Sequence, residues 1–296
     1  MIYAGEELST YIIKTEEKIT LKSNLEDFLK SINLLDKNDI LEIDLSNVKF
    51  IKPESLIVLV TASELAYKKT CKPVVWKELN SDITSYLERI DVNKLPFISL
   101  KKKSQNKKYY RSSKQSENLV ELAVITDWKK IGEAIQKTRG VINRWLPEKS
   151  SSYRGDLITL LKETVENSVD HSGEHPKEGV CYYVVQKYVY EGNVDIQIAV
   201  GDTGVGMLNS LKRVYKDTKD DVEAIWGALV DGKSGRKTGG GLGYYTIKEA
   251  LSGLKGSLTI RSGTGLLKYN PSYDKPYIYR KKTKYPGTQI IFHCKG

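Results

Sequence analysis

The sequence has few of the features that mark secreted, disulfide-stabilised or membrane-spanning proteins. It holds three cysteines in 296 residues, Cys71, Cys181 and Cys294, which are too few and too far apart for a disulfide framework or a cysteine metal motif. No stretch approaches the run of about 18 apolar residues that a membrane-spanning helix needs. The N-terminus has no basic region followed by an apolar core, as a signal peptide would. We therefore expect a cytoplasmic protein with reduced thiols and no membrane partner.

The positive charge of the chain is concentrated in two short segments. The net charge is +10, yet residues 1–100 carry 13 basic against 16 acidic side chains. Residues 101–117 hold seven basic residues and one acid, and residues 268–285 hold six and one. The first has the composition of a linker, and the second, rich in tyrosine, that of a loop or hairpin extension. Either segment can contact an acidic partner or nucleic acid, although solvated basic loops are the simpler interpretation.

The first hundred residues alternate between strand-like and helix-like patterns. Residues 41–45 alternate apolar and polar side chains, as a strand with one buried face does. Pro53 opens a stretch with apolar residues at helical spacing, residues 73–76 form a second strand pattern, and residues 81–90 an amphipathic one. This order predicts an α/β domain over residues 1–100. That stretch has no histidine and no glycine-rich phosphate loop, so we expect no active site there.

One turn in this domain has a recognisable motif. Residues 44–56 read Asp-Leu-Ser-Asn-Val-Lys-Phe-Ile-Lys-Pro-Glu-Ser-Leu and resemble the core of STAS domains, the fold typified by anti-anti-sigma factors. A serine in that turn of the family accepts phosphate, but here Glu54 stands in its place and Ser55 stands where the family has glycine. The resemblance implies a STAS-like domain whose usual acceptor is a carboxylate that can imitate a phosphorylated side chain. An unrelated small α/β domain is the alternative.

A polar stripe runs along a predicted helix over residues 157–171. Glu163, Asn167 and His171 are spaced four residues apart, so their side chains lie on one face of the helix. The amide of Asn167 is a neutral oxygen ligand for Mg²⁺. The carboxylate of Glu163 can orient or deprotonate a group that attacks a γ-phosphate, and the imidazole of His171 can donate to a phosphate oxygen. Taken alone, such a stripe equally suits a solvated helix face.

An aspartate with nearby glycines follows a predicted strand over residues 194–200. Asp202 comes just after the strand, with Gly204, Gly206 and Met207 next. A buried aspartate in this position can accept a hydrogen bond from an exocyclic amine, and the glycines let the backbone approach a flat ring closely. An ordinary Asp-x-Gly turn is the alternative.

A glycine-rich segment precedes the next predicted helix, over residues 244–251. Its glycines are Gly239, Gly240, Gly241 and Gly243, with Leu242 among them. Free backbone N–H groups at a helix N-terminus favour phosphate, and three basic residues of the same loop add positive charge: Lys233, Arg236 and Lys237. The segment is not a Walker loop, because it lacks the upstream glycine. A closing strand, residues 287–292, begins with Gly287 and Thr288.

In this order and spacing, the four elements resemble the GHKL (Bergerat-fold) superfamily of histidine kinases, topoisomerase ATPase subunits, Hsp90, MutL-type proteins and anti-sigma serine kinases. The resemblance covers residues 118–296. It implies an α/β sandwich with helices on one face of a mixed sheet, joined to the first domain by a linker over residues 101–117. It also implies ATP and Mg²⁺ as cofactors.

The resemblance further assigns roles to individual residues. It implies Glu163 as the catalytic base, Asn167 as the Mg²⁺ ligand and Asp202, supported by Thr288, as the acceptor for the adenine amine. The other nucleotide-binding residues that it implies are His171, Gly204, Gly206, Met207, Gly239, Gly240, Gly241, Leu242 and Gly243.

The same motifs narrow the function. Histidine autophosphorylation is excluded, because His171, His175 and His293 all lie inside the predicted ATP domain. The stripe from Glu163 to His171 looks most like that of the anti-sigma serine kinases, whose substrates are STAS proteins. The leading hypothesis is therefore a nucleotide-dependent signalling switch that acts on a STAS-type or sigma-like protein partner, with ATP hydrolysis or Ser/Thr phosphotransfer.

Two alternatives from other classes remain. One is an ATP-gated homodimeric ATPase that acts on nucleic acid, as topoisomerases and MutL do, with residues 101–117 and 268–285 as the basic contacts. The other is an ATP-binding scaffold with negligible turnover. Residues 131–146 loosely echo a helix-turn-helix, but we expect one amphipathic helix there.

Overall fold

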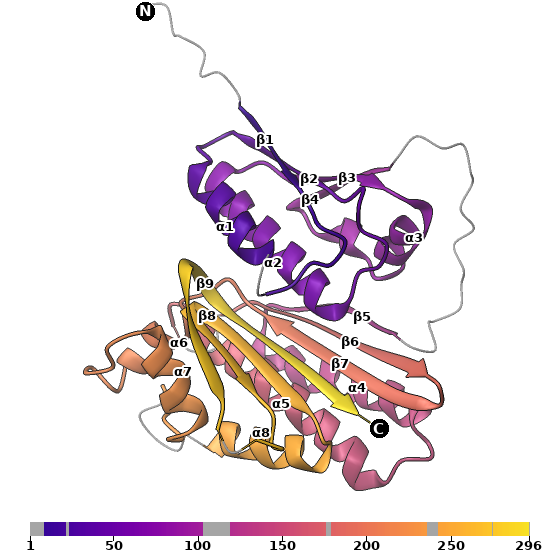
Figure 1. Ribbon diagram of the computed structural model, residues 1–296, viewed down its shortest axis with the longest axis vertical. Coiled ribbons are helices and arrows are strands. Elements are labelled where there is room, and N and C mark those ends of the chain that lie inside the picture. The colour runs from indigo at the N-terminus through magenta and orange to yellow at the C-terminus, as the bar shows by residue number, and fades with distance from the viewer. Residues whose placement is uncertain are drawn as a thin grey trace, which may run out of the picture. The chain divides into compact units, whose positions relative to one another are not determined.

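The chain divides into two compact units, Met1–Ser113 and Lys114–Gly296. The computed structural model describes residues 9–21, 24–102, 119–175, 179–235, 242–273 and 275–295. Both units combine helices with a β-sheet (Figure 1), so the predicted α/β class is confirmed. Within the described residues, no helix combines the length and the apolar character that crossing a lipid bilayer requires.

The N-terminal unit is built on a four-stranded sheet in which every described pairing is parallel. The strands lie in the order β1-β2-β3-β4. The elements along the chain are β1 (Thr10–Lys14), α1 (Asn24–Leu34), β2 (Ile40–Asp44), α2 (Pro53–Thr70), β3 (Val74–Leu79), α3 (Ser81–Arg89), the 3₁₀ turn η1 (Val92–Lys94) and β4 (Ile98–Lys102). The strands and helices predicted from residues 41–45, 53–65, 73–76 and 81–90 are all present.

Helix α2 begins where the sequence predicts, because Pro53 at its first position needs no backbone N–H. The helix ends at Cys71, whose φ of 59° is left-handed. It is buried nearly all round, as its almost continuous apolar sequence requires. Helix α3 is capped by Asn80, whose side chain accepts from the N–H of Ile83.

The C-terminal unit holds a five-stranded sheet in the order β5-β6-β7-β9-β8. Its elements are β5 (Leu119–Ile125), the 3₁₀ turn η2 (Trp128–Lys130), α4 (Ile131–Trp145), α5 (Ser151–Ser172), β6 (Cys181–Tyr190), β7 (Asn193–Gly201), α6 (Gly206–Lys212), α7 (Asp221–Leu229), α8 (Leu242–Gly253), β8 (Ser257–Tyr269) and β9 (Tyr277–Lys295). Residues 131–145 form one helix, as predicted, and not a helix-turn-helix.

The expected mixed sheet is wrong in one respect, because every described pairing in this sheet is antiparallel. A tight turn joins β6 to β7 and a longer hairpin connection joins β8 to β9, which makes those pairs antiparallel. A helical crossover joins β7 to β8, and these two strands do run in the same direction. They do not pair, because β9 lies between them.

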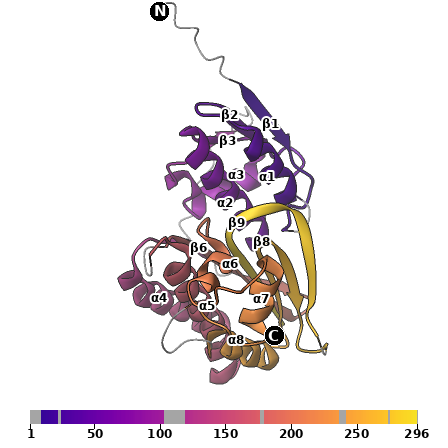
Figure 2. The ribbon, with the colours of Figure 1, turned by 90° about the vertical axis from the view of Figure 1, so that its left-hand side faces the viewer.

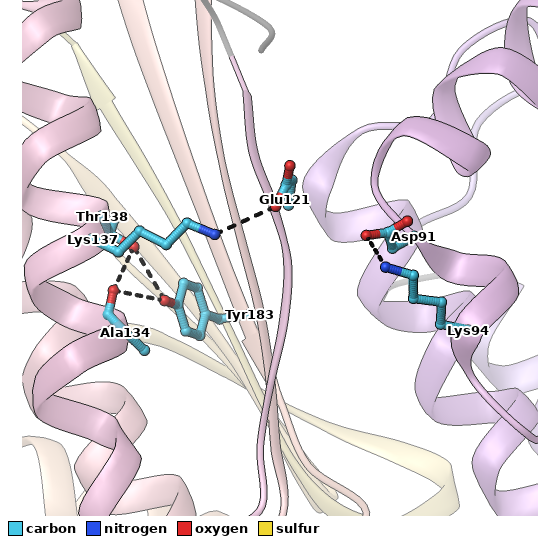
Figure 3. Close-up of polar contacts among 7 residues, drawn as sticks. All are labelled: Asp91, Lys94, Glu121, Ala134, Lys137, Thr138 and Tyr183. Atoms are coloured by element: carbon cyan, nitrogen blue, oxygen red, sulfur yellow. Dashed lines mark hydrogen bonds and ion pairs between the residues drawn. The ribbon is translucent and has the colours of Figure 1, made fainter. Parts of the chain in front are cut away.

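Helices α4, α5 and α8 cover one face of this sheet (Figures 1 and 2), as the sandwich prediction requires. Alternate residues of the strands point into the core that they share with the helices. Tyr183 of β6 illustrates the packing (Figure 3): its hydroxyl lies 3.1 Å from that of Thr138 on α4 and 3.3 Å from the carbonyl of Ala134. Burial raises the pKa of Tyr183 to about 12, so this phenol stays protonated and available as a donor.

Candidate functional site

A pocket of about 720 Å³, part of it open to solvent, lies among α5, α6, α8 and the ends of β7 and β9. Eleven of the lining residues have polar side chains: Thr164, Asn167, Ser168, His171, Ser172, Asp202, Ser210, Lys233, Ser234, Tyr244 and Thr288. The others include the apolar side chains of Val200, Met207, Leu211, Ala228 and Ile290. Apolar walls with a few convergent polar groups suit a flat aromatic ring that carries hydrogen-bonding atoms.

Asp202, directly after β7, is the buried acid of this pocket, with 3% of its surface exposed. The hydroxyl of Ser168 donates to its Oδ2 over 3.0 Å. The backbone N–H groups of Gly204 and Thr288 donate to its Oδ1 over 3.0 and 3.1 Å. These three donors hold the carboxylate in one orientation and compensate for its burial.

Two glycines let the backbone close around Asp202. A Cβ added to Gly204 would lie 2.0 Å from the carbonyl oxygen of Ser172. A Cβ added to Gly287, whose φ is +107°, would lie 2.2 Å from the carbonyl oxygen of Asp202. Both obstacles are backbone atoms, so these positions admit only glycine without rearrangement of the fold.

Thr288 supports Asp202 through its backbone rather than through its hydroxyl. Its N–H donates to the carboxylate, and its carbonyl accepts from the N–H of Asp202 over 2.9 Å. Its hydroxyl lies 3.1 Å from that of Ser262, which donates to the carbonyl of Gly287 and accepts from the N–H of Met207. This network joins β8, β9 and the start of α6 at one edge of the pocket.

Helix α5 carries the predicted polar stripe, part of which lines the pocket. Asn167 and His171 line the pocket. Glu163, whose side chain is 26% exposed, is not among the lining residues. It lies beside Asn167 at the start of α8: a Cβ on Gly243 would be 3.1 Å from Oε2 of Glu163 and 3.4 Å from Nδ2 of Asn167. The stripe therefore meets the end of the glycine-rich segment.

Part of that glycine-rich segment lies outside the described residues. This holds for Gly239, Gly240 and Gly241, and for the side chain of Leu242, with which α8 begins. Lys233, earlier in the same loop, is described and lines the pocket. Its ammonium lies 5.6 Å from the ring centre of Tyr215, and its stem crosses Gly227, where a Cβ would come within 2.9 Å. A cation thus faces the pocket directly upstream of the predicted lid.

Several residues that sequence reasoning did not assign also contribute. The Tyr285 hydroxyl donates to the backbone carbonyl of Asp202. Tyr244 lines the pocket, and burial, followed by the charge of Asp202, raises the pKa of its phenol. Ser168 could have been found from the sequence, because it is a polar residue on the apolar face of α5. Ser262 and Tyr285 carry no comparable signal.

The residues present fit a magnesium nucleotide. Among the described residues, the hydroxyl of Ser172 is buried in the pocket lining without a hydrogen-bond partner, so a ligand or water is needed to satisfy it. No group of three or more His, Cys, Asp or Glu side chains in the described ranges is arranged to hold a metal ion. Mg²⁺ here would depend on the oxygen of Asn167 and on phosphate oxygens, the arrangement that this ion accepts in nucleotide sites.

Comparison with known families agrees with this geometry. Residues 153–295 match the family model described as histidine kinase-, DNA gyrase B- and HSP90-like ATPase. The match covers α5 and the rest of the pocket and stops short of the N-terminal unit. No curated protein sequence matches the chain.

Proposed function

We propose that residues 153–295, which match the family described as histidine kinase-, DNA gyrase B- and HSP90-like ATPase, form an ATP-binding domain and that this chain is a nucleotide-dependent regulatory protein. In this proposal the domain binds Mg·ATP and either hydrolyses it slowly or transfers its γ-phosphate to a serine or threonine of a protein partner. The partner is a STAS-type or sigma-like regulator.

The geometry around Asp202 supports adenine as the base. An ionised carboxylate is an acceptor only, so it suits the exocyclic amine of adenine and repels the oxygen that guanine carries at the same place. Met207 and Ile290 supply apolar surface beside it. Gly206, with a φ of +75°, starts α6 without a Cβ that would crowd Ser262 and Gly287.

One observation carries the catalytic part of the proposal: Glu163, Asn167 and Gly243 converge at one edge of the pocket. The carboxylate of Glu163 is close enough to Asn167 to act on a hydroxyl or water positioned near phosphates held there. When bound, Mg²⁺ neutralises charge on the phosphate oxygens. Asn167 would hold the ion, while His171 and Lys233 donate to the phosphates.

The N-terminal unit supports a regulatory rather than a substrate role. The carboxylate of Glu54 accepts the backbone N–H of Leu21 over 2.8 Å. The Ser55 hydroxyl donates to the carbonyl of Ile19 over 2.8 Å, and Ser55 is 4% exposed. Glu54 has no hydroxyl that could accept phosphate, and the hydroxyl of Ser55 is buried and hydrogen-bonded. We therefore propose that the acceptor lies on a separate STAS protein, and that this unit, taken as STAS-like, regulates the kinase domain.

The deciding experiment measures binding and phosphate release together. Calorimetry with Mg·ATP on the wild type and on Asn167→Ala should show binding that the substitution weakens by about tenfold or more. In the same samples, release of γ-phosphate should fall by about 100-fold in Glu163→Gln, because a general base contributes 10²–10⁴-fold, while ATP affinity stays close to that of the wild type.

The chain offers a matched control for Glu163. Glu166 lies on the same helix, is 25% exposed against 26% for Glu163, and also lies near Lys162. Glu166→Gln should leave both measurements unchanged. Equal loss of phosphate release in both variants would contradict a catalytic role for Glu163. Binding without turnover in the wild type would reduce the protein to an ATP-binding scaffold.

Phosphotransfer is tested separately with γ-labelled ATP and candidate STAS proteins. Label on a serine or threonine of the partner, lost in Glu163→Gln and kept in Glu166→Gln, is the expected outcome. Label on a histidine of the chain would contradict the proposal. A homodimer and a cytoplasmic location remain further expectations, the first of which sedimentation with and without Mg·ATP would test.

A further inference from the structure

The C-terminal sheet continues into a two-stranded ribbon that the proposed function does not use. Strand β9 pairs with β7 only over Gln289–Lys295, whereas its earlier residues pair with β8 alone, as far as Tyr277 opposite Lys268. Figure 1 shows this long β8–β9 hairpin in yellow and orange. The ribbon corresponds to the tyrosine-rich basic segment, residues 268–285.

Three aromatic rings are exposed together on this ribbon. Tyr273, Tyr277 and Tyr279 are 59%, 57% and 50% exposed. The rings of Tyr273 and Tyr277 contact edge to face with centres 6.4 Å apart. Tyr277 and Tyr279 are two residues apart on one strand, so their side chains project from the same face about 6.8 Å apart. Single exposed aromatics are ordinary, but three adjacent ones mark a contact surface.

Exposed cations accompany these rings. Lys268 lies directly across from Tyr277, and Lys282 and Lys284 follow on β9. In the part of the chain that the structure describes, no carboxylate lies within ion-pair distance of these three lysines. Arg280 differs, because its guanidinium is held 2.6 Å from Asp220. The three lysines therefore give a positive potential beside the aromatic surface.

The backbone that presents these lysines is held from within. Ser262 on β8 pairs with Thr288 on β9, and Gly265 pairs with Arg280. Because β9 has more residues than β8 between these two pairs, β9 forms a large bulge. The guanidinium of Arg261, fully buried, donates to the carbonyls of Gly263 and Gly265 on β8 and to Thr283 in the bulge. A buried arginine that donates to three backbone carbonyls stabilises the conformation of the bulge. It therefore holds the backbone that carries Lys282 and Lys284.

We propose that this tyrosine–lysine ribbon, defined by Tyr273, Tyr277, Tyr279, Lys268, Lys282 and Lys284, binds single-stranded nucleic acid. The rings offer stacking surfaces for unpaired bases, and the lysines contact phosphates of the same strand. An acidic peptide would use the cations but would leave the three rings without a role. A duplex keeps its bases stacked inside and out of their reach. The inference does not depend on what the ATP site does.

The test is binding of a fluorescent thymidine oligonucleotide of about 16 nucleotides to the full chain, followed by anisotropy over a series of salt concentrations. We expect binding that weakens as salt rises. Tyr277→Ala/Tyr279→Ala should weaken it by about 5- to 150-fold for each ring that stacks on a base. Lys282→Glu/Lys284→Glu should weaken it and lower the slope of log affinity against log salt by about 0.7 for each phosphate that is no longer neutralised.

Matched controls exist on other parts of the same unit. Tyr190 is 75% exposed on the β6–β7 hairpin, and Lys129 and Lys130 are exposed on η2. Tyr190→Ala and Lys129→Glu/Lys130→Glu should bind as the wild type does, and thermal unfolding checks that every variant is folded. No binding by the wild type up to about 100 µM at low salt, binding unchanged in both ribbon variants, or equally good competition by a glutamate peptide of similar length would each overturn the proposal.

Discussion

The phenol of Tyr285 on β9 donates a hydrogen bond to the backbone carbonyl of Asp202, directly after β7. Both residues are almost completely buried. Because the side chain of Asp202 faces the pocket while its carbonyl is held by Tyr285, this bond links the base of the β8–β9 ribbon to the pocket. The position of the Asp202 carboxylate therefore depends on a residue outside the predicted nucleotide-binding motifs.

Tyr285→Phe tests that link. Removing the hydroxyl leaves the carbonyl of Asp202 without this donor, which should lower the free energy of unfolding by about 1–3 kcal/mol. It should also weaken Mg·ATP binding about fivefold, the equivalent of one net hydrogen bond. Tyr183→Phe is the control, since it removes another buried phenol that contacts Thr138 on α4 (Figure 3). It should lower stability and leave ATP affinity unchanged. Equal effects on affinity would contradict the link.

Asp202→Asn should change which base the pocket prefers. The wild type should bind ATP at least about 100-fold more tightly than GTP, because a site that accepts from an amine leaves its acceptor facing the guanine oxygen. The asparagine amide can donate as well as accept. The affinity of the variant for ATP should therefore fall about tenfold or more, and the ratio of its ATP affinity to its GTP affinity should be smaller than that of the wild type. Calorimetry with both nucleotides measures this.

Asp221→Asn provides the comparison for a buried acid outside the pocket. Asp221 is 8% exposed and accepts from the N–H and hydroxyl of Thr264. This variant should lose stability but keep the ATP-to-GTP ratio. Equal affinities of the wild type for ATP and GTP would show that Asp202 does not discriminate between the two bases.

Gly287→Ala should disrupt the close approach of β9 to the backbone of Asp202. Its added methyl would lie 2.2 Å from a backbone oxygen, at a φ of +107°, and neither strand can move without breaking the hydrogen bonds between Asp202 and Thr288. We expect a loss of about 3 kcal/mol or more in the free energy of unfolding, measured with urea. Gly192→Ala, in the β6–β7 turn, has a φ of +78° and open space around it. It should cost only about 1 kcal/mol, and an equal cost for both would contradict the steric argument.

The site could be predicted from the sequence where short motifs determine local geometry. Spacing alone places Glu163, Asn167 and His171 on one face of α5. Pro53 likewise marks the start of α2. These features depend on neighbouring residues, so the local sequence contains the information. The sequence predicts that the glycines after Asp202 let the backbone approach a flat ring, whereas in the structure Gly204 allows a close approach to the backbone of Ser172.

The remainder depends on contacts between distant strands. Ser262 and Tyr285 reach the proposed nucleotide site because β9 inserts between β7 and β8, a pairing that no local pattern encodes. The same insertion makes the sheet antiparallel where a mixed sheet was expected. The bulge that Arg261 fills is equally invisible in sequence, where Arg261 is one of many basic residues. Register between strands, rather than secondary structure, was the missing information.

The junction of α7 and the ribbon holds a carboxylate, Asp220, whose contribution to stability depends on pH. Asp220 caps α7 by accepting the N–H groups of Glu223 and Val222 and lies 2.6 Å from Arg280. The N–H of Glu223 and then Arg280 lower the pKa of this carboxyl from its ordinary value. A lowered pKa in the folded state adds stability that is fully present above the unfolded value of about 3.9 and is lost as pH falls through the folded value.

Asp220→Asn keeps a good cap and removes the charge. The variant should be about 0.5 kcal/mol less stable than the wild type near pH 7, the scale of an exposed ion pair, and the difference should shrink below about pH 4. Urea unfolding at both pH values measures it. Asp127→Asn is the control, because Asp127 caps η2 through the N–H of Lys129 and, within the described ranges, has no cation at ion-pair distance. If the two variants lose stability alike at neutral pH, Arg280 contributes nothing to the junction, and the ribbon is attached to α7 by other contacts, such as those of Asp221 with Thr264.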